Sequence, residues 1–123
     1  MKKILVIETD AVTGRRMRGL WKAAGYNVRL VSEFAQAAFE AVQWGPDLIT
    51  LDMDGAEEQA RDVLLQLQAR PHTSRIPVVL FSNRGAQKIP EALLRSVRTI
   101  VDRRADPVQV IQSAPELALS VVG

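Results

Sequence analysis

The feature that most constrains the fold is a regular alternation between short apolar runs and segments with helical spacing. Ile4–Ile7, Leu48–Leu51 and Ile76–Phe81 are apolar runs of strand length, as expected of strands buried on both faces. Apolar residues recur with the period of a helix between these runs, first at Met17, Leu20, Trp21 and Ala24. Strands that alternate with helices in this way predict an α/β domain with a parallel sheet covered on both faces.

Turn and cap residues mark the ends of the expected elements. Gly25 follows the first helical segment, Ser32 can cap the second, and Gly45-Pro46 ends it. Residues 26–30 alternate apolar and polar side chains, which predicts a half-covered edge strand. A third helix is expected from Ala60, Val63, Leu64 and Leu67, and a shorter fourth from Ile89, Leu93, Leu94 and Val97.

The last part of the chain completes the alternation. Thr99–Val101 reads as a weak fifth strand, and Asp106-Pro107 is a strong start for a final helix. Pro115 then predicts a kink or a restart in that helix. With 123 residues and no internal repeat, residues 1–123 are expected to form a single domain.

Composition excludes several classes of function. The chain has no cysteine, which rules out a disulfide framework, a thiolate metal site and a cysteine nucleophile. A net charge of +2 is too small to indicate nucleic-acid binding, and no apolar run is long enough to span a membrane. The basic start is followed by only four apolar residues before Glu8, so we expect a cytoplasmic first strand and not a signal peptide.

Polar and charged residues follow four of the expected strands. In parallel α/β sheets, working residues lie at the carboxyl ends of the strands, so these groups are expected to meet at one edge. Carboxylates gathered there suit phosphoryl transfer to an aspartate, with a hard divalent cation and cationic or hydroxyl groups around the phosphoryl oxygens. The four groups are Glu8-Thr9-Asp10, Asp52-Met53-Asp54, Ser82-Asn83 and Asp102-Arg103-Arg104.

Four stretches resemble successive landmarks of the receiver domain of two-component response regulators. They are Lys3–Asp10, Ala24–Val28, Pro46–Asp52 and Ile76–Ser82, and Asp106-Pro107 fits the start of the last helix. The resemblance implies a flavodoxin-like, doubly wound, five-stranded parallel sheet of order 2-1-3-4-5 with helices on both faces. It also implies a signalling switch and not an enzyme, working in a two-component phosphorelay.

The resemblance also implies roles for individual residues. Asp52 would be the phosphoacceptor, and Ser82 and Arg103 would contact the phosphoryl group. Mg²⁺ would be held by Glu8, Asp52 and Asp54, the last through its backbone carbonyl. Asp10 is a possible further metal ligand, because it lies next to the position where a second acidic residue is usual.

The sequence departs from the receiver pattern at several of these positions. Thr9 replaces the second acidic residue, Arg103 replaces a lysine, and Arg104 replaces the proline after it. Loss of a carboxylate weakens a hard-cation site, and arginine is wider and more planar than lysine. These departures leave open a pseudo-receiver, a module that binds partner proteins without phosphorylation.

Partners follow from the same resemblance. A histidine kinase or a downstream signalling protein is the expected partner, with no direct nucleic-acid or membrane contact. The chain is expected to be a monomer or a weak homodimer through its last two helices and fifth strand. A small nucleotide- or flavin-binding enzyme is a less favoured alternative, because no glycine-rich phosphate loop follows the first strand.

Overall fold

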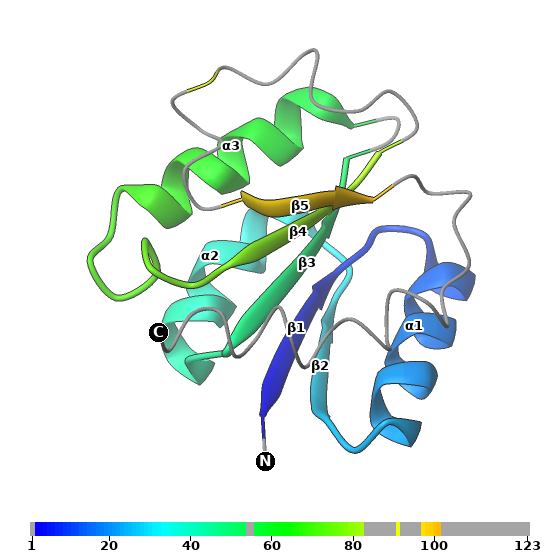
Figure 1. The fold of residues 1–123 in the computed structure, drawn as a ribbon. Helices are drawn as coiled ribbons and strands as arrows, with labels where there is room; N and C mark the ends of the chain where they lie inside the picture. Colours follow the sequence, from blue (N-terminus) through cyan, green and yellow to red (C-terminus); the bar gives the residue numbers. More distant parts are fainter. Residues whose placement is uncertain (1, 54–55, 83–90, 92–96, 102–123) are drawn as a thin grey trace.

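The computed structural model describes residues 2–53, 56–82, 91 and 97–101. They form an α/β fold, a parallel β-sheet with flanking helices (Figure 1). Its five strands are arranged in the order β2-β1-β3-β4-β5, and every neighbouring pair is parallel. The predicted flavodoxin-like order 2-1-3-4-5 is therefore confirmed. The strands are β1 (Lys3–Ile7), β2 (Asn27–Val31), β3 (Leu48–Asp52), β4 (Val78–Phe81) and β5 (Val97–Val101).

Helices cover both faces of this sheet, as predicted. α1 (Ala11–Ala23) lies against one face, and α2 (Phe34–Trp44) and α3 (Glu57–Gln68) lie side by side against the other (Figure 1). Asp10 begins α1, because its carboxylate accepts a hydrogen bond from the Thr13 backbone N–H at 2.9 Å. Gly45 ends α2 in a left-handed conformation with φ 65°, which a side chain would strain.

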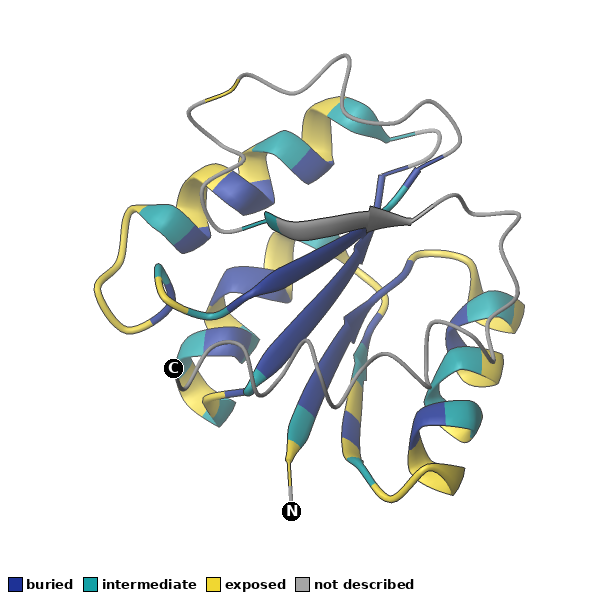
Figure 2. Ribbon diagram, in the orientation of Figure 1, coloured by how far each residue is buried: buried dark blue, intermediate teal, exposed yellow. Residues whose placement is uncertain are grey.

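The continuous apolar runs of β1 and β3 are buried (Figure 2). Their alternate residues enter two separate cores, one on each face of the sheet. Leu5, Ile7 and Leu51 pack in the larger core beneath α2 and α3. Ile4, Val6 and Leu48 pack in the second core, whose largest side chain is Trp21 of α1. Burial on both faces explains why these strands show no polar alternation.

Some of the expected boundaries differ from the structure. Ala24 is exposed and caps the C-terminus of α1, because the helix ends before its last apolar position. Ser32 does not cap α2; Glu33 occupies that place, without a side-chain hydrogen bond to the helix. β4 begins at Val78 and not at Ile76, since Ile76 closes the preceding turn through a backbone bond to Thr73.

Other expectations fall outside the described residues. These are most of the fourth helix and the final helix with its proline kink, and with them the dimer contact expected through those helices. Val97, which was expected in the fourth helix, instead begins β5, two residues before the expected start of the fifth strand. The expected edge strand is confirmed, since β2 lies at the border of the sheet. Within the described ranges, no helix is long and apolar enough to cross a membrane.

Two neighbouring leucines of α3 provide a test of this core. Leu64 is fully buried, whereas Leu65 is 57% exposed. Leu64→Ala should lower the free energy of unfolding by about 2–5 kcal/mol, because it removes buried methyl groups and leaves a cavity. Leu65→Ala should change it by less than about 0.5 kcal/mol. Urea denaturation of both variants measures this difference, and equal losses would contradict the placement of α3.

Candidate functional site

Three of the predicted site residues lie at one edge of the sheet, at the carboxyl ends of three adjacent strands. Glu8 follows β1, Asp52 ends β3, and Ser82 follows β4. The pairing of Ile7 with Leu51 places Glu8 beside Asp52 at the next position. Asp52 is in turn paired with Phe81, the residue before Ser82. Neighbouring strands are about 4.8 Å apart, so the three residues lie within one small region.

The side chains of Glu8 and Asp52 are directed to the same face of the sheet. Alternate strand residues share a face, and Glu8 continues the alternation of Ile4 and Val6 on the α1 side. Asp52 follows Leu48 in the same way, and Leu48 also belongs to the core beneath α1. The two carboxylates are therefore neighbours on one face.

All three polar side chains are buried. Glu8 is 3% exposed, Asp52 is 6% exposed and Ser82 is 5% exposed. Such deep burial is unusual for the two carboxylates, because removing an ionised group from water is costly. None of the three is without an interacting partner. Such burial distinguishes Glu8 and Asp52 from the solvated acids at the surface and is typical of groups kept for a chemical role.

Backbone hydrogen bonds hold the strand ends on either side of these residues. The Glu8 N–H donates to the Val31 carbonyl at 3.0 Å, so β1 stays attached to β2 at the point where the acid emerges. The Met53 N–H donates to the Phe81 carbonyl at 3.1 Å, and the Met53 side chain is buried in the larger core. The backbone at Glu8 is thus held to β2, and the backbone next to Asp52 is held to β4.

Gly14 lets α1 approach the strand ends closely, and it is absent from the candidates taken from the sequence. A Cβ atom at Gly14 would lie 3.0 Å from Leu30 Cδ1 and 3.6 Å from Glu8 Cγ. Helix α1 therefore passes directly over the stem of Glu8. An isolated glycine inside a helical pattern is the sequence signal that could have indicated such close packing.

The other predicted site residues are placed differently or lie outside the described structure. Asp10 is the N-cap of α1, so its carboxylate already serves the helix terminus. Asp54 and Arg103 lie outside the described residues, and their predicted roles stay predictions. Thr9, which replaces an acidic residue, is exposed.

The donor set at this edge fits a hard divalent cation in part. Glu8 and Asp52 provide two neighbouring carboxylates, and Mg²⁺ is often bound by one or two carboxylates with water in its remaining positions. Across residues 2–53, 56–82, 91 and 97–101, no group of three or more histidine, cysteine or acidic side chains could hold a metal ion. Among the described residues, Glu8 and Asp52 are therefore the carboxylates at this edge that could hold a cation.

Comparisons with known proteins identify the fold. The sequence is 26% identical over 121 residues to the phosphate regulon transcriptional regulatory protein PhoB of Rhizobium meliloti (strain 1021). That match covers 98% of the chain but 51% of PhoB, so the chain spans about half the length of this curated relative. No model of a known protein family matches the sequence.

Solved structures agree with this comparison. A sensor protein from Polaromonas sp. JS666 superimposes with a TM-score of 0.86 at 19% identity, covering 98% of both chains. The receiver domain of a sensor histidine kinase from Pseudomonas aeruginosa PAO1 gives 0.79 at 18% identity, covering 99% of this chain and 98% of that one. Its structure contains a magnesium ion coordinated in the active-site cleft.

The chain has the fold of a response-regulator receiver domain. The resemblance predicted from the four sequence landmarks is thereby confirmed. In this receiver fold Glu8, Asp52 and Ser82 occupy the carboxyl edge of the sheet, where the sequence predicted them to meet. The chemistry performed at that edge is a separate question.

Two glycines of α1 test the close contact between this helix and Glu8. Gly19 has no atom within 4 Å of an added Cβ, whereas at Gly14 the added atom meets Leu30. Gly19→Ala should raise the free energy of unfolding by about 0.5–1 kcal/mol, because alanine favours the helix. Gly14→Ala should give a smaller gain or a loss, since Leu30 must move. Equal gains in urea denaturation would contradict the close approach of α1.

Proposed function

We propose that this chain is a phospho-accepting receiver domain of a two-component signalling system, with Asp52 as the phosphoacceptor. The observation that carries the proposal is the pair of buried carboxylates, Glu8 and Asp52, on adjacent strands at the carboxyl edge of a receiver fold. An aspartate carboxylate is a competent nucleophile toward a phosphoryl group, which leaves its donor as an acyl phosphate forms. The protein then acts as a switch and not as an enzyme.

The neighbours of Asp52 suit the developing charge of a transferred phosphoryl group. The Ser82 hydroxyl lies at the end of the adjacent strand and can donate a hydrogen bond to a phosphoryl oxygen. Arg103 is assigned by the sequence resemblance to a cationic contact with the same group. Both roles are part of the proposal.

Glu8 and Asp52 would hold Mg²⁺, with the backbone carbonyl of Asp54 as a proposed third ligand. When bound, the cation would offset the negative charge that gathers between the carboxylate and the phosphoryl oxygens. The Pseudomonas aeruginosa receiver domain with its coordinated magnesium ion supports this choice of metal. With Asp10 engaged as a helix cap, affinity for the cation should be modest.

The proposed partner is a histidine kinase that donates the phosphoryl group, followed by a downstream signalling protein that reads the switch. The similarity to PhoB and to a receiver domain of a sensor histidine kinase supports a place in such a pathway. Thr9 and Asp10, which follow Glu8 at this edge, are exposed, so a donor would approach Asp52 past these two residues.

A pseudo-receiver that binds partners without phosphorylation is the second candidate. It is favoured by Thr9 in place of an acid and by the engagement of Asp10 in capping α1. In that case the buried acids would be structural, and the surface alone would recognise the partner.

Phosphorylation distinguishes the two candidates directly. Incubation with acetyl phosphate and Mg²⁺ should add the mass of one phosphoryl group to the intact protein. Asp52→Asn should abolish the addition, because the amide is not a nucleophile of this kind. Asp62→Asn, which changes an exposed aspartate of α3, should be labelled like the wild type. An unlabelled wild type, beside a receiver domain that is labelled in parallel, would favour the pseudo-receiver.

A second prediction concerns the metal. Glu8→Gln should raise the Mg²⁺ concentration needed for half-maximal labelling by about tenfold or more, because one of two carboxylate ligands is lost. Asp10→Asn should leave that concentration nearly unchanged, since asparagine still caps the helix. Labelling measured at a series of Mg²⁺ concentrations tests both variants. An unchanged requirement in Glu8→Gln would remove Glu8 from the metal site.

A further inference from the structure

The backbone of α1 at Gly14 lies against two side chains of the sheet, Leu30 and Glu8. Gly14 is one of the two buried residues of α1, and a Cβ atom added there would meet both neighbours. It would lie 3.0 Å from Leu30 Cδ1 and 3.2 Å from Leu30 Cδ2, which is tighter than ordinary carbon contact. Its distance to Glu8 Cγ would be 3.6 Å, an ordinary contact. Any side chain at this position therefore shares its space with Leu30 and with the stem of Glu8.

Helix α1 is held at both ends, so it cannot easily move away from these neighbours. At its start, the Thr13 N–H donates to the Asp10 carboxylate at 2.9 Å, and the Gly14 N–H donates to the Asp10 carbonyl at 2.9 Å. Near its other end, the Trp21 side chain is buried and meets the Tyr26 ring edge-on, with ring centres 5.7 Å apart. A shift of the whole helix would disturb both sets of contacts.

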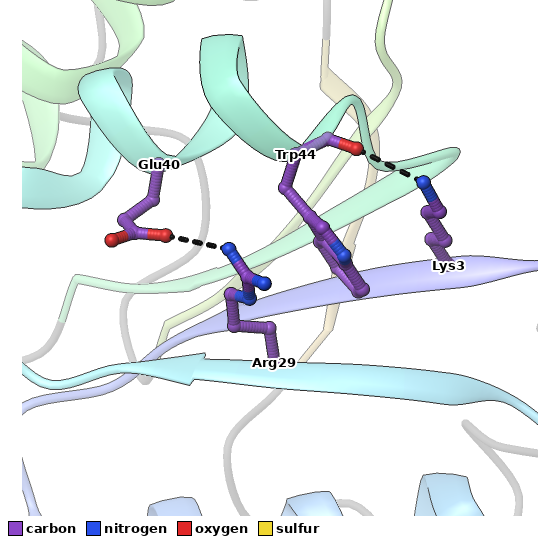
Figure 3. Close-up of polar contacts among 4 residues, drawn as sticks. All are labelled: Lys3, Arg29, Glu40 and Trp44. Carbon is purple, nitrogen blue, oxygen red and sulfur yellow. Dashed lines mark hydrogen bonds and ion pairs between the residues drawn. The ribbon is translucent and has the colours of Figure 1, made fainter.

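The strand that carries Leu30 is held as well. β2 pairs with β1 along its whole length. On the opposite face of β2, Arg29 contacts α2 through two side chains (Figure 3). Its guanidinium pairs with Glu40 at 3.1 Å and lies 5.0 Å from the centre of the Trp44 ring. A carbon atom added on α1 must therefore be accommodated by side chains, because both backbones are held.

Glu8 is the side chain in this contact that also belongs to the candidate site. Its backbone N–H donates to the Val31 carbonyl at 3.0 Å, so its stem is the part that can respond to a change on α1. A glutamate stem has one more rotatable bond than the stem of Asp52, and its carboxylate position is defined only when packing selects one rotamer. The close backbone of α1 at Gly14 supplies packing of this kind.

We propose that Gly14 is a positioning residue for the cation site, because its lack of a side chain lets α1 hold the Glu8 carboxylate in one position. The inference rests on the proposed function, in which Glu8 and Asp52 hold Mg²⁺. Mg²⁺ demands nearly ideal octahedral geometry with oxygen ligands at about 2.0–2.1 Å, whereas Ca²⁺ accepts irregular geometry at about 2.3–2.6 Å. A fixed Glu8 therefore matters more for Mg²⁺ than for Ca²⁺, and Gly14 contributes to selectivity between the two ions.

Affinities for Mg²⁺ and Ca²⁺ test this role. Amide shifts of Met53, followed by NMR as each cation is added to the unphosphorylated chain, give the two dissociation constants. Gly14→Ala should raise the constant for Mg²⁺ by about threefold or more and that for Ca²⁺ by less, because Ca²⁺ tolerates a displaced ligand. Gly19→Ala, whose added carbon has no atom within 4 Å, should leave both constants unchanged.

A second substitution tests whether the effect passes through the crowded contact. Leu30→Val shortens the side chain that faces Gly14, so Gly14→Ala combined with Leu30→Val should recover most of the Mg²⁺ affinity. The two single variants and the double variant form a cycle that isolates this coupling. Urea denaturation of each variant measures stability separately from cation affinity.

The outcomes separate this inference from the proposed function. A wild type that binds Mg²⁺ no better than Gly14→Ala would overturn the positioning role and leave the cation site standing. Equal losses for Mg²⁺ and Ca²⁺, or a loss that Leu30→Val does not relieve, would also assign Gly14 to packing alone. A wild type that binds neither cation would overturn the cation site itself, and this inference with it.

Discussion

The structure depends on burying the central strands β1 and β3 on both faces. Their apolar side chains alternate between two cores, one beneath α1 and one beneath α2 and α3. Each strand is covered on both sides by helices, and its neighbours are parallel strands joined by crossover connections, as is usual for sheets buried on both faces. All the carboxyl ends then lie at one edge of the sheet, and the polar residues that follow the strands must meet there.

This constraint explains how residues far apart in the sequence form one site. Asp52 is the last residue of β3, whereas Glu8 and Ser82 are the residues that directly follow β1 and β4. The strand register fixes their spacing, and hydrogen bonds from Glu8 and Met53 to neighbouring strands fix the backbone around them. Burial of two carboxylates opposes folding, because ionised groups lose hydration. Buried carboxylates at such an edge indicate a functional site, and phosphoryl transfer is the proposal that follows.

The sequence predicts most of the fold because the apolar patterns report burial directly. The four core positions of α3 are all buried as expected, and β2 lies at the edge as its alternation indicates. The exact ends of elements are harder to predict, because Ser32 and Glu33 are both plausible caps and tertiary packing decides between them. Gly14 and the cluster of Lys3, Arg29 and Trp44 depend on contacts between distant segments, which no local pattern contains. The proximity of Glu8 to Asp52 follows from the strand order once the fold is known. The role of Asp10 as the N-cap of α1 follows instead from local backbone geometry.

The proposed phosphoryl transfer requires that Glu8 and Asp52 together bind a divalent cation at the carboxyl edge of the sheet. Backbone amide chemical shifts, followed by NMR during a Mg²⁺ titration, test it most directly. We expect saturable shifts that are largest at Glu8, Asp52 and Met53, with little change at the opposite ends of β1 and β3. Shifts that omit Glu8, or that appear only at exposed acids such as Glu58 and Asp62, would contradict it.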